Sequence, residues 1–283
     1  MPPRTTTTAR QQRVGVELRK MREAAGFTSR EAAARLGIDH TKISHMEAAR
    51  FGVSVERLRM LASGYGCDDE SYVNALAEMA SERGKGWWER YRGILPAGFL
   101  DLTELECRAT ALSTYQVAHV PGLAQTEDYA RAVFGLTFPR LTKDGVEARI
   151  SHRIRRAEML EQQDAPTSTA LIHEAALRMR FGGRELARAQ LEHLLKLSEH
   201  PKFTMRVIPF EADGFAGSGQ AVLYASGPVA QLDTVQLDSA HGAIFLDAQA
   251  QLKAYRDLLA AMERRSLSVR RSRDLTRKIA REL

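Results

Sequence analysis

Residues 14–36 carry their apolar side chains at the spacing of amphipathic helices. The first of these helices has one apolar face, formed by Val14, Leu18, Met21 and Ala25. It is predicted to end at Gly26, because glycine is typical of the position that follows a helix. Thr28 and Glu31 then have the spacing of a capping box, which predicts a second, short helix that reaches Gly37.

Three further helices are predicted before residue 85. Asp39 is a suitable N-cap for a third helix over residues 40–48. A fourth helix has an inner face formed by Val53, Val55, Leu58 and Leu61. A fifth, over residues 68–84, begins with acidic side chains, which the positive end of the helix dipole favours. Two short helices joined by a glycine turn, inside a bundle of five, are the helix-turn-helix arrangement.

The pattern changes after residue 84. Helices are predicted over residues 101–113, from Thr126 onward, and over 144–162, 185–200 and 248–283. Strands are predicted for the runs STALIHEA, FTMRVIPF, QAVLYAS, VAQLDTVQL and GAIFLD. We therefore expect a multi-domain, mainly α chain. It consists of a disordered arm at residues 1–12, a five-helix helix-turn-helix domain at 13–84, and a larger α+β regulatory or dimerisation domain with a small sheet at 85–283.

The charge of the chain is concentrated in its N-terminal part. Residues 1–66 carry twelve Lys and Arg against six Asp and Glu, whereas the rest of the chain carries 29 of each kind. A basic segment joined to a neutral one indicates a part that binds a polyanion and a body with another task. A solvated surface is the simpler reading of the same charge.

Residues of the first three helices resemble the Xre/Cro-type helix-turn-helix family. The matching positions are Leu18, Arg19, Arg22, Gly26, Thr28, Glu31, Ala33, Leu36, Gly37, Ile38, Ile43, Ser44, Met46 and Glu47. The resemblance implies that the third helix lies in the major groove of double-stranded DNA. It also implies a buried ion pair between Arg22 and Glu47. The family often has a glutamine where Ser29 stands, and Asn-Gly where Ala48, Ala49 and Arg50 stand.

The resemblance and the residue types together identify a candidate DNA-binding set. Ile43 and Met46 are expected to face inward, and five side chains of the third helix outward, where they could contact bases: His40, Thr41, Lys42, Ser44 and His45. Residues near the start of the second helix and after the third are expected near phosphates: Thr28, Ser29, Arg30 and Arg50. The alternative is an ordinary solvated helix with two incidental histidines.

The C-terminal region resembles the actinobacterial WhiJ-like family of such regulators. The phrases VPGLAQTEDYARA and HPKFTMRVIPF carry this resemblance. Members are commonly associated with small companion proteins, so the resemblance implies that a companion is a possible partner. An unknown small-molecule effector is a further possible partner, with the segment around Trp87 and Tyr91 and the loops near Pro121 and Gly217 as candidate walls.

Features of enzymes and metal sites are incomplete in this sequence. HEAAL at 173–177 lacks the second histidine of a zinc-protease helix, and Ser218 and His241 have no nucleophile elbow around them. Cys67 and Cys107 fit no metal motif. No apolar run is long enough to cross a membrane, and the N-terminus lacks the apolar segment of a signal peptide. We expect a cytoplasmic protein that is not an enzyme and needs no cofactor or metal.

These observations favour a sequence-specific transcriptional regulator that acts as a homodimer, with a C-terminal module that binds an effector or a partner. The alternative is an interaction protein that binds and neutralises a small companion protein. In that case DNA binding would serve chiefly to regulate the pair's own genes.

Overall fold

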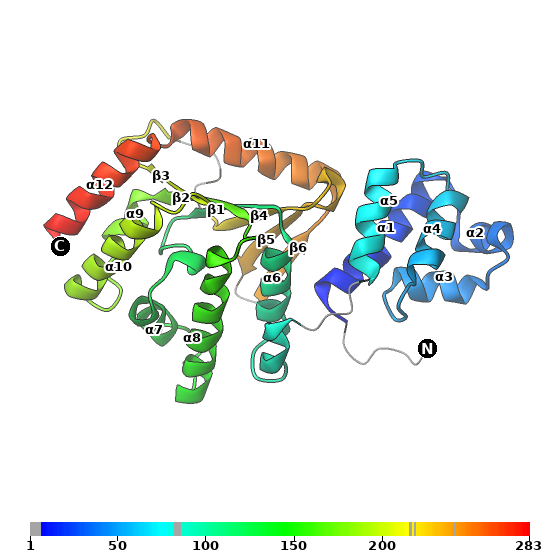
Figure 1. Cartoon of the computed structure of the whole chain (residues 1–283), viewed down its shortest axis with the longest axis horizontal. Coiled ribbons are helices and arrows are strands. Elements are labelled where there is room, and N and C mark those ends of the chain that lie inside the picture. The colour runs from blue at the N-terminus through cyan, green and yellow to red at the C-terminus, as the bar shows by residue number, and fades with distance from the viewer. Residues whose placement is uncertain (1–6, 82–85, 215–216, 218, 240–241) are drawn as a thin grey trace. The chain divides into compact units, whose positions relative to one another are not determined.

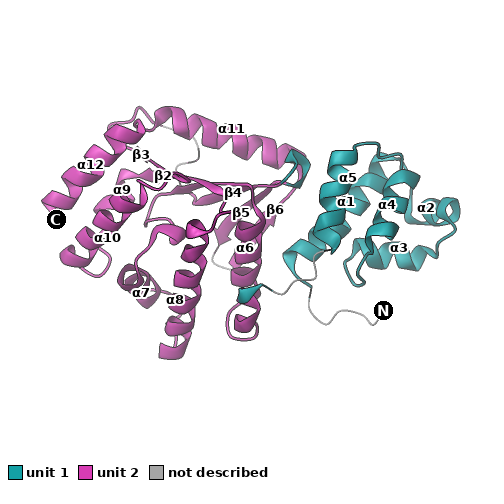
Figure 2. Cartoon of the chain, viewed as in Figure 1, with its two compact units in different colours: residues 1–87, 228–232 teal, residues 88–227, 233–283 magenta. Residues whose placement is uncertain are grey.

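The structure is a computed structural model that describes residues 7–81, 86–214, 217, 219–239 and 242–283. The chain divides into two compact units, which Figure 2 shows in different colours. Unit 1 contains residues 1–87 and 228–232, and unit 2 contains residues 88–227 and 233–283. The domain boundary expected between residues 84 and 85 lies outside the described residues, and so do residues 1–6 of the expected arm.

Unit 1 contains the helices labelled α1 to α5 in Figure 1. They are α1 (Ala9–Ala24), α2 (Ser29–Leu36), α3 (His40–Glu47), α4 (Val55–Gly64) and α5 (Glu70–Ser81). Their apolar faces meet in one core, in which the least exposed large side chains are Leu18, Ile43, Leu58, Leu61 and Leu76. The predicted helical bundle with its helix-turn-helix is therefore confirmed.

Helix α1 begins earlier than the sequence reading placed it. We expected disorder up to residue 12, but the chain is helical from Ala9. Thr8 forms a capping box with Gln11: each backbone N–H donates to the other's side chain, both over 3.3 Å. These two hydrogen bonds satisfy amides that would otherwise lack partners at the helix start, so the polar composition of this stretch does not prevent a helix.

Unit 2 is built on a mixed six-stranded sheet. Its strands are β1 (Ala111–Gln116), β2 (Thr167–His173), β3 (Phe203–Ile208), β4 (Val222–Ser226), β5 (Thr234–Ser239) and β6 (Gly242–Leu246). The strand order is β3-β2-β1-β4-β5-β6. Strands β1, β2 and β3 run parallel, whereas β4, β5 and β6 pair antiparallel with their neighbours. The carboxyl end of β1 therefore lies beside the start of β4, at the same end of these two strands.

The prediction of a helix over residues 101–113 is wrong at its C-terminal end. Helix α6 ends at Arg108, and β1 begins at Ala111. β1 pairs in parallel with β2 and antiparallel with β4, so it has neighbours on both sides. Those two neighbours are distant in sequence, and their hydrogen bonds outweigh a local pattern that fits a helix as well. The sheet consequently has six strands, against the five expected.

Helices cover both faces of this sheet (Figure 1). They are α6 (Ala97–Arg108), α7 (Glu127–Gly135), α8 (Lys143–Ala157), α9 (Glu174–Arg178), α10 (Arg184–Leu197), α11 (Gln249–Arg265) and α12 (Val269–Glu282). The described residues also contain four short 3₁₀ segments: η1 (Trp87–Tyr91), η2 (Gly122–Ala124), η3 (Glu158–Glu161) and η4 (Ala230–Leu232). The long α11 packs through Leu252 and Met262 against the face that carries Tyr115. α6, α7, α10 and α12 contribute to the clusters on the other face, which include Leu112 and Ala170.

Candidate DNA-binding surface

The hairpin formed by α2 and α3 is fixed by local caps. Thr28 opens α2, where its hydroxyl accepts from the amide of Glu31 over 3.2 Å and the Glu31 carboxylate accepts from the Thr28 amide over 2.7 Å. Gly37 ends the helix in the left-handed region, with φ of 65°. Asp39 opens α3 by accepting from the Thr41 amide over 2.7 Å. The angle of the turn is therefore set by side chains that stand within the hairpin itself.

Helix α3 has an inner and an outer side. Ile43 and Met46 are buried in the core of the bundle. Four of the candidate base-contacting side chains are exposed: His40, Thr41, Lys42 and Ser44. His45 differs from the others, because it is half-buried and its ring packs edge-on against Phe51 at a centroid distance of 5.0 Å. The outer side therefore consists mainly of short polar groups and one lysine.

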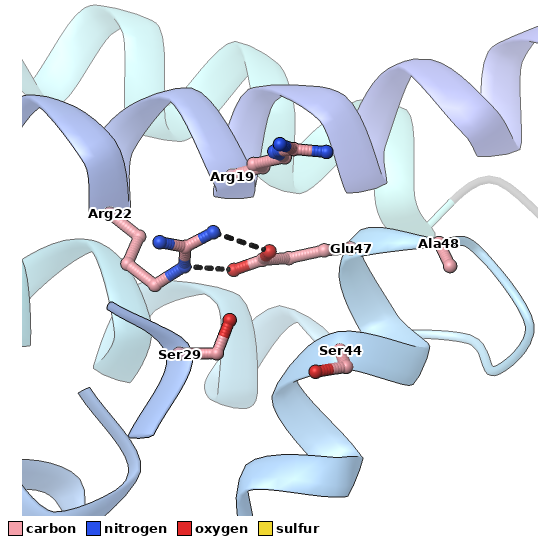
Figure 3. Close-up of a pocket in the computed structure, with 6 residues that line it drawn as sticks. All are labelled: Arg19, Arg22, Ser29, Ser44, Glu47 and Ala48. Atoms are coloured by element: carbon pink, nitrogen blue, oxygen red, sulfur yellow. Dashed lines mark hydrogen bonds and ion pairs between the residues drawn. The ribbon is translucent and has the colours of Figure 1, made fainter. Parts of the chain in front are cut away.

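Arg22 of α1 and Glu47 at the end of α3 form a bidentate ion pair (Figure 3). The Arg22 Nε donates to Oε1 over 2.6 Å and Nη2 to Oε2 over 2.9 Å. The Arg22 Nη1 donates to the Phe27 carbonyl over 2.6 Å. Both charged side chains are more than nine-tenths buried. The hydrogen bond to Glu47 raises the pKa of Arg22. One guanidinium thus ties α1, the loop before α2 and the end of α3 together.

Helices α1 and α3 also approach closely at Gly15. A Cβ atom at this position would lie 2.4 Å from the Glu47 carbonyl oxygen and 2.8 Å from that of Met46. Both oxygens are backbone atoms, so they cannot turn aside as a side chain can. Glycine is therefore required where α1 crosses the C-terminal end of α3.

A hollow of about 310 Å³ lies between α1, α2 and α3. Its lining consists of Arg19, Arg22, Ser29, Ser44, Glu47 and Ala48 (Figure 3). Ser29 and Ser44, which were both expected at the DNA, are brought together here. Arg19 joins them although it was not among the candidate contacts. It is exposed and its Nε donates to Glu23 over 2.7 Å. The signal in the sequence was its place one turn before Arg22.

The remaining candidate residues lie around this hairpin. Thr28 and Arg30 are exposed at the start of α2, and Ser29 beside them is half-buried. Arg50 is exposed after α3. The turn before it places Ala49, a non-glycine residue that is 2% exposed, at φ of 55°. That is the left-handed conformation which Asn or Gly adopts more easily, at a position where the sequence has neither.

The surface of the hairpin carries several positively charged side chains and two acidic ones, Asp39 and Glu31. Asp39 stays ionised at the start of α3, because hydrogen bonds from Thr41 hold the pKa of its carboxyl below the ordinary value. Hydrogen bonds from Thr28 lower the pKa of Glu31 in the same way. These carboxylates neutralise the helix starts, so anion binding there depends on the neighbouring Arg and Lys side chains.

Two family models match the chain. One, described as a domain of unknown function (DUF5753), matches residues 99–278, which is more than half of the 283 residues. The chain belongs to the DUF5753 family. The other, described as a helix-turn-helix domain, matches residues 13–72, the part that contains the hairpin and its ion pair. No curated protein and no solved structure matches the chain significantly.

Among the described residues, no group of three or more His, Cys, Asp or Glu side chains could hold a metal ion. Cys67 and Cys107 are free thiols. Ser218 and His241 lie outside the described residues. No helix in the described part of the chain is long and apolar enough to cross a membrane.

The segments suggested as walls of an effector site have different surroundings. Trp88 and Tyr91 are largely buried. Gly217 lies against α11, since a Cβ there would be 2.8 Å from Leu258. Pro121 precedes η2, beside the arginines of α8 described below.

Proposed function

We propose that this DUF5753 protein is a sequence-specific transcriptional regulator that binds double-stranded DNA through α3. The observation that carries the proposal is the outer side of α3, where His40, Thr41, Lys42 and Ser44 stand exposed on a hairpin fixed by caps and by the Arg22–Glu47 pair. The helix-turn-helix match over the same residues supports it.

Each group has a chemically suitable partner on DNA. Lys42 and His40 can donate to the O6 and N7 atoms of guanine, and Thr41 offers a hydroxyl and a methyl group for a thymine edge. Ser29, Arg30 and Arg50 would contact phosphates on either side of the groove, which would fix the register without reading sequence. The excess of positive charge in residues 1–66 would attract the DNA backbone.

We further propose an Xre/Cro-type reading mode, a WhiJ-like regulatory role without enzymatic activity, and a cytoplasmic location. Two copies of the chain would bind two half-sites about one helical turn apart, as symmetric helix-turn-helix regulators do. The α+β unit would supply dimerisation and effector binding. Light scattering of the full chain tests the dimer: a monomer at micromolar concentration would contradict it.

A gel-shift assay tests DNA reading. The full chain is titrated onto fragments from upstream of its own gene and its neighbours, in the presence of competitor DNA and at two salt concentrations. Lys42→Ala is compared with wild type, with Arg59→Ala as the control. Arg59 is an exposed cation of the same unit, on α4 outside the hairpin, so the control removes an equal charge.

The expected result is that wild type and Arg59→Ala select the same fragment and that Lys42→Ala loses the selection. A lost base contact should reduce discrimination by about 1–3 kcal/mol. If all three proteins bind every fragment alike and dissociate together as salt rises, the contacts are to phosphate alone and α3 does not read sequence.

A further inference from the structure

Arg153 of α8 stands in unit 2 without an acidic partner. The residue as a whole is half-buried, and no carboxylate in the described residues lies within ion-pair distance of its guanidinium. Its Nη1 donates to the Oε1 of Gln125, and its Cζ lies 4.4 Å from the centre of the Phe134 ring. A guanidinium has five N–H donors, but the contacts of this one are a hydrogen bond to a neutral acceptor and a cation–π contact with an aromatic ring.

Gln125 presents its oxygen to Arg153 in a fixed orientation. The side chain is 2% exposed, and its Nε2 donates to the Val120 carbonyl over 2.7 Å. That bond assigns the amide nitrogen to Val120 and leaves the oxygen for the arginine. The guanidinium is thereby held in place by a neutral group, so its positive charge remains uncompensated at this contact.

Arg156, one turn further along α8, has a nearby carboxylate but no hydrogen bond from its Nε. Its Nε lies 3.1 Å from the Oε2 of Glu106, and both side chains are buried. The orientation of the two groups does not make a hydrogen bond, so both atoms are buried without one. Burial also raises the pKa of the Glu106 carboxyl. Glu106 is therefore poorly aligned even with Arg156, and Arg153 lies beyond ion-pair distance of it.

The backbone of η2 makes room for these two arginines. A Cβ at Gly122 would lie 2.6 Å from the Arg156 Nη2 and 3.6 Å from the Arg153 Cζ. Gly122 begins η2, after the loop that follows β1, so the guanidinium groups lie beside a glycine. Backbone without a side chain is what allows charged groups to approach this closely.

The other titratable groups here do not restore the balance. Burial lowers the pKa of His119, which keeps that ring neutral. Asp238 acts on Arg153 electrostatically, but it is exposed and its carboxylate accepts from Gln236 Nε2 over 2.7 Å. Burial, and then repulsion from Arg156, lower the pKa of Arg153 to about 9. A buried cation in this situation is stabilised by an anion that binds beside it.

We propose that Arg153, with Gln125 and Arg156, forms a binding site for the oxyanion of a small ligand, either a carboxylate or a phosphate. Both anions match the planar fork of an arginine and accept two parallel hydrogen bonds from it. The proposal deepens the effector-binding role given above to unit 2 and rests on it. Pro121, expected to border an effector site, immediately precedes Gly122 here.

Isothermal titration calorimetry of the full chain, without DNA, tests the site. The two probes are inorganic phosphate and succinate, each titrated at constant ionic strength set with sodium chloride. Wild type is compared with Arg153→Gln, which keeps a polar side chain but removes the charge. Arg155→Gln is the matched control, because Arg155 lies on the same helix, is exposed and pairs with the exposed Glu158.

We expect saturable binding of at least one probe to wild type and to Arg155→Gln, with the Kd raised at least tenfold in Arg153→Gln. Arg153→Lys keeps the charge but loses the planar guanidinium with its parallel donors, so it should bind the probe more weakly than wild type. This variant also tests the site if Arg153→Gln fails to fold. The probe that binds distinguishes carboxylate from phosphate. Absence of saturable binding to wild type, or equal binding by wild type and both Arg153 variants, overturns the proposal. A gel shift with and without the bound probe is a separate measurement, so a failure of DNA reading would leave the calorimetric result standing.

Discussion

Replacing Gly15 by alanine sets two physical effects against each other. Gly15 lies inside α1, where helix propensity alone favours alanine by about 1 kcal/mol. In the structure, however, the added Cβ would lie 2.4 Å from the Glu47 carbonyl oxygen. Close carbon–oxygen contacts in proteins are about 3.3–3.6 Å, so the C-terminal end of α3 must retreat by roughly 1 Å.

The expected net effect is destabilising. Overpacking of this kind costs about 1–3 kcal/mol. The retreat also displaces Glu47 from the buried guanidinium of Arg22, with which it makes two hydrogen bonds. After the gain in propensity is subtracted, we expect the free energy of unfolding of unit 1 to fall by about 2 kcal/mol. For a domain of this size, that lowers Tm by roughly 8–16 °C.

Differential scanning calorimetry of the full chain measures this shift. Gly135→Ala is the control, because Gly135 is also helical but an added Cβ would meet nothing within 4 Å. The control should leave Tm unchanged or raise it slightly. If Gly15→Ala raises Tm as well, helix propensity alone decides the outcome, and α1 does not cross α3 as closely as described.

Three other predictions concern single side chains. Glu47→Ala leaves the buried Arg22 without its carboxylate and should lower the free energy of unfolding by about 3–5 kcal/mol; urea unfolding checks this, and an Arg22→Met/Glu47→Leu double variant that recovers nothing would contradict it. Ala49→Val should destabilise by about 2 kcal/mol, because a β-branched residue fits poorly at φ of 55°, whereas Ala49→Gly should change stability by less than about 1 kcal/mol in the same urea assay. Burial, followed by the nearby arginines, lowers the pKa of His152 to about 3. Below the ordinary histidine pKa of about 6.5, the unfolded chain therefore binds a proton at this residue that the folded chain does not bind. As the pH is lowered from 6 to 4, this group should reduce the free energy of unfolding by about 1.4 kcal/mol per pH unit. His152→Gln should reduce the slope by that amount in unfolding curves measured across this range, and an unchanged slope would refute the assignment.

Local signals in the sequence predicted the helical unit well. The capping box of Thr28 and Glu31, the left-handed turn at Gly37 and the cap at Asp39 each involve residues within four positions of one another. Such signals are visible in a single sequence because the interacting groups are neighbours. The cap formed by Thr8 and Gln11 has the same form, but the polar stretch around it favoured disorder instead.

Features that depend on distant residues could not be predicted. β1 becomes a strand because β2 and β4 lie on either side of it, and neither neighbour is near in sequence. The half-buried position of His45 depends on Phe51, and its place in the helix alone put it outward. The arginines of α8 look like ordinary helix surface residues in sequence, and only the fold shows that Arg156 lies beside the buried Glu106.

The position of β1 also has a consequence for synthesis of the chain on the ribosome. Thr114 of β1 donates to the Val222 carbonyl of β4, 108 residues further along. The central strand of the sheet thus emerges early and must wait for its second partner, while α1 to α5 make mostly local contacts and can fold sooner. During that interval one edge of β1 is open to wrong pairing. A truncation before residue 222 would therefore release a chain with an incomplete, aggregation-prone sheet.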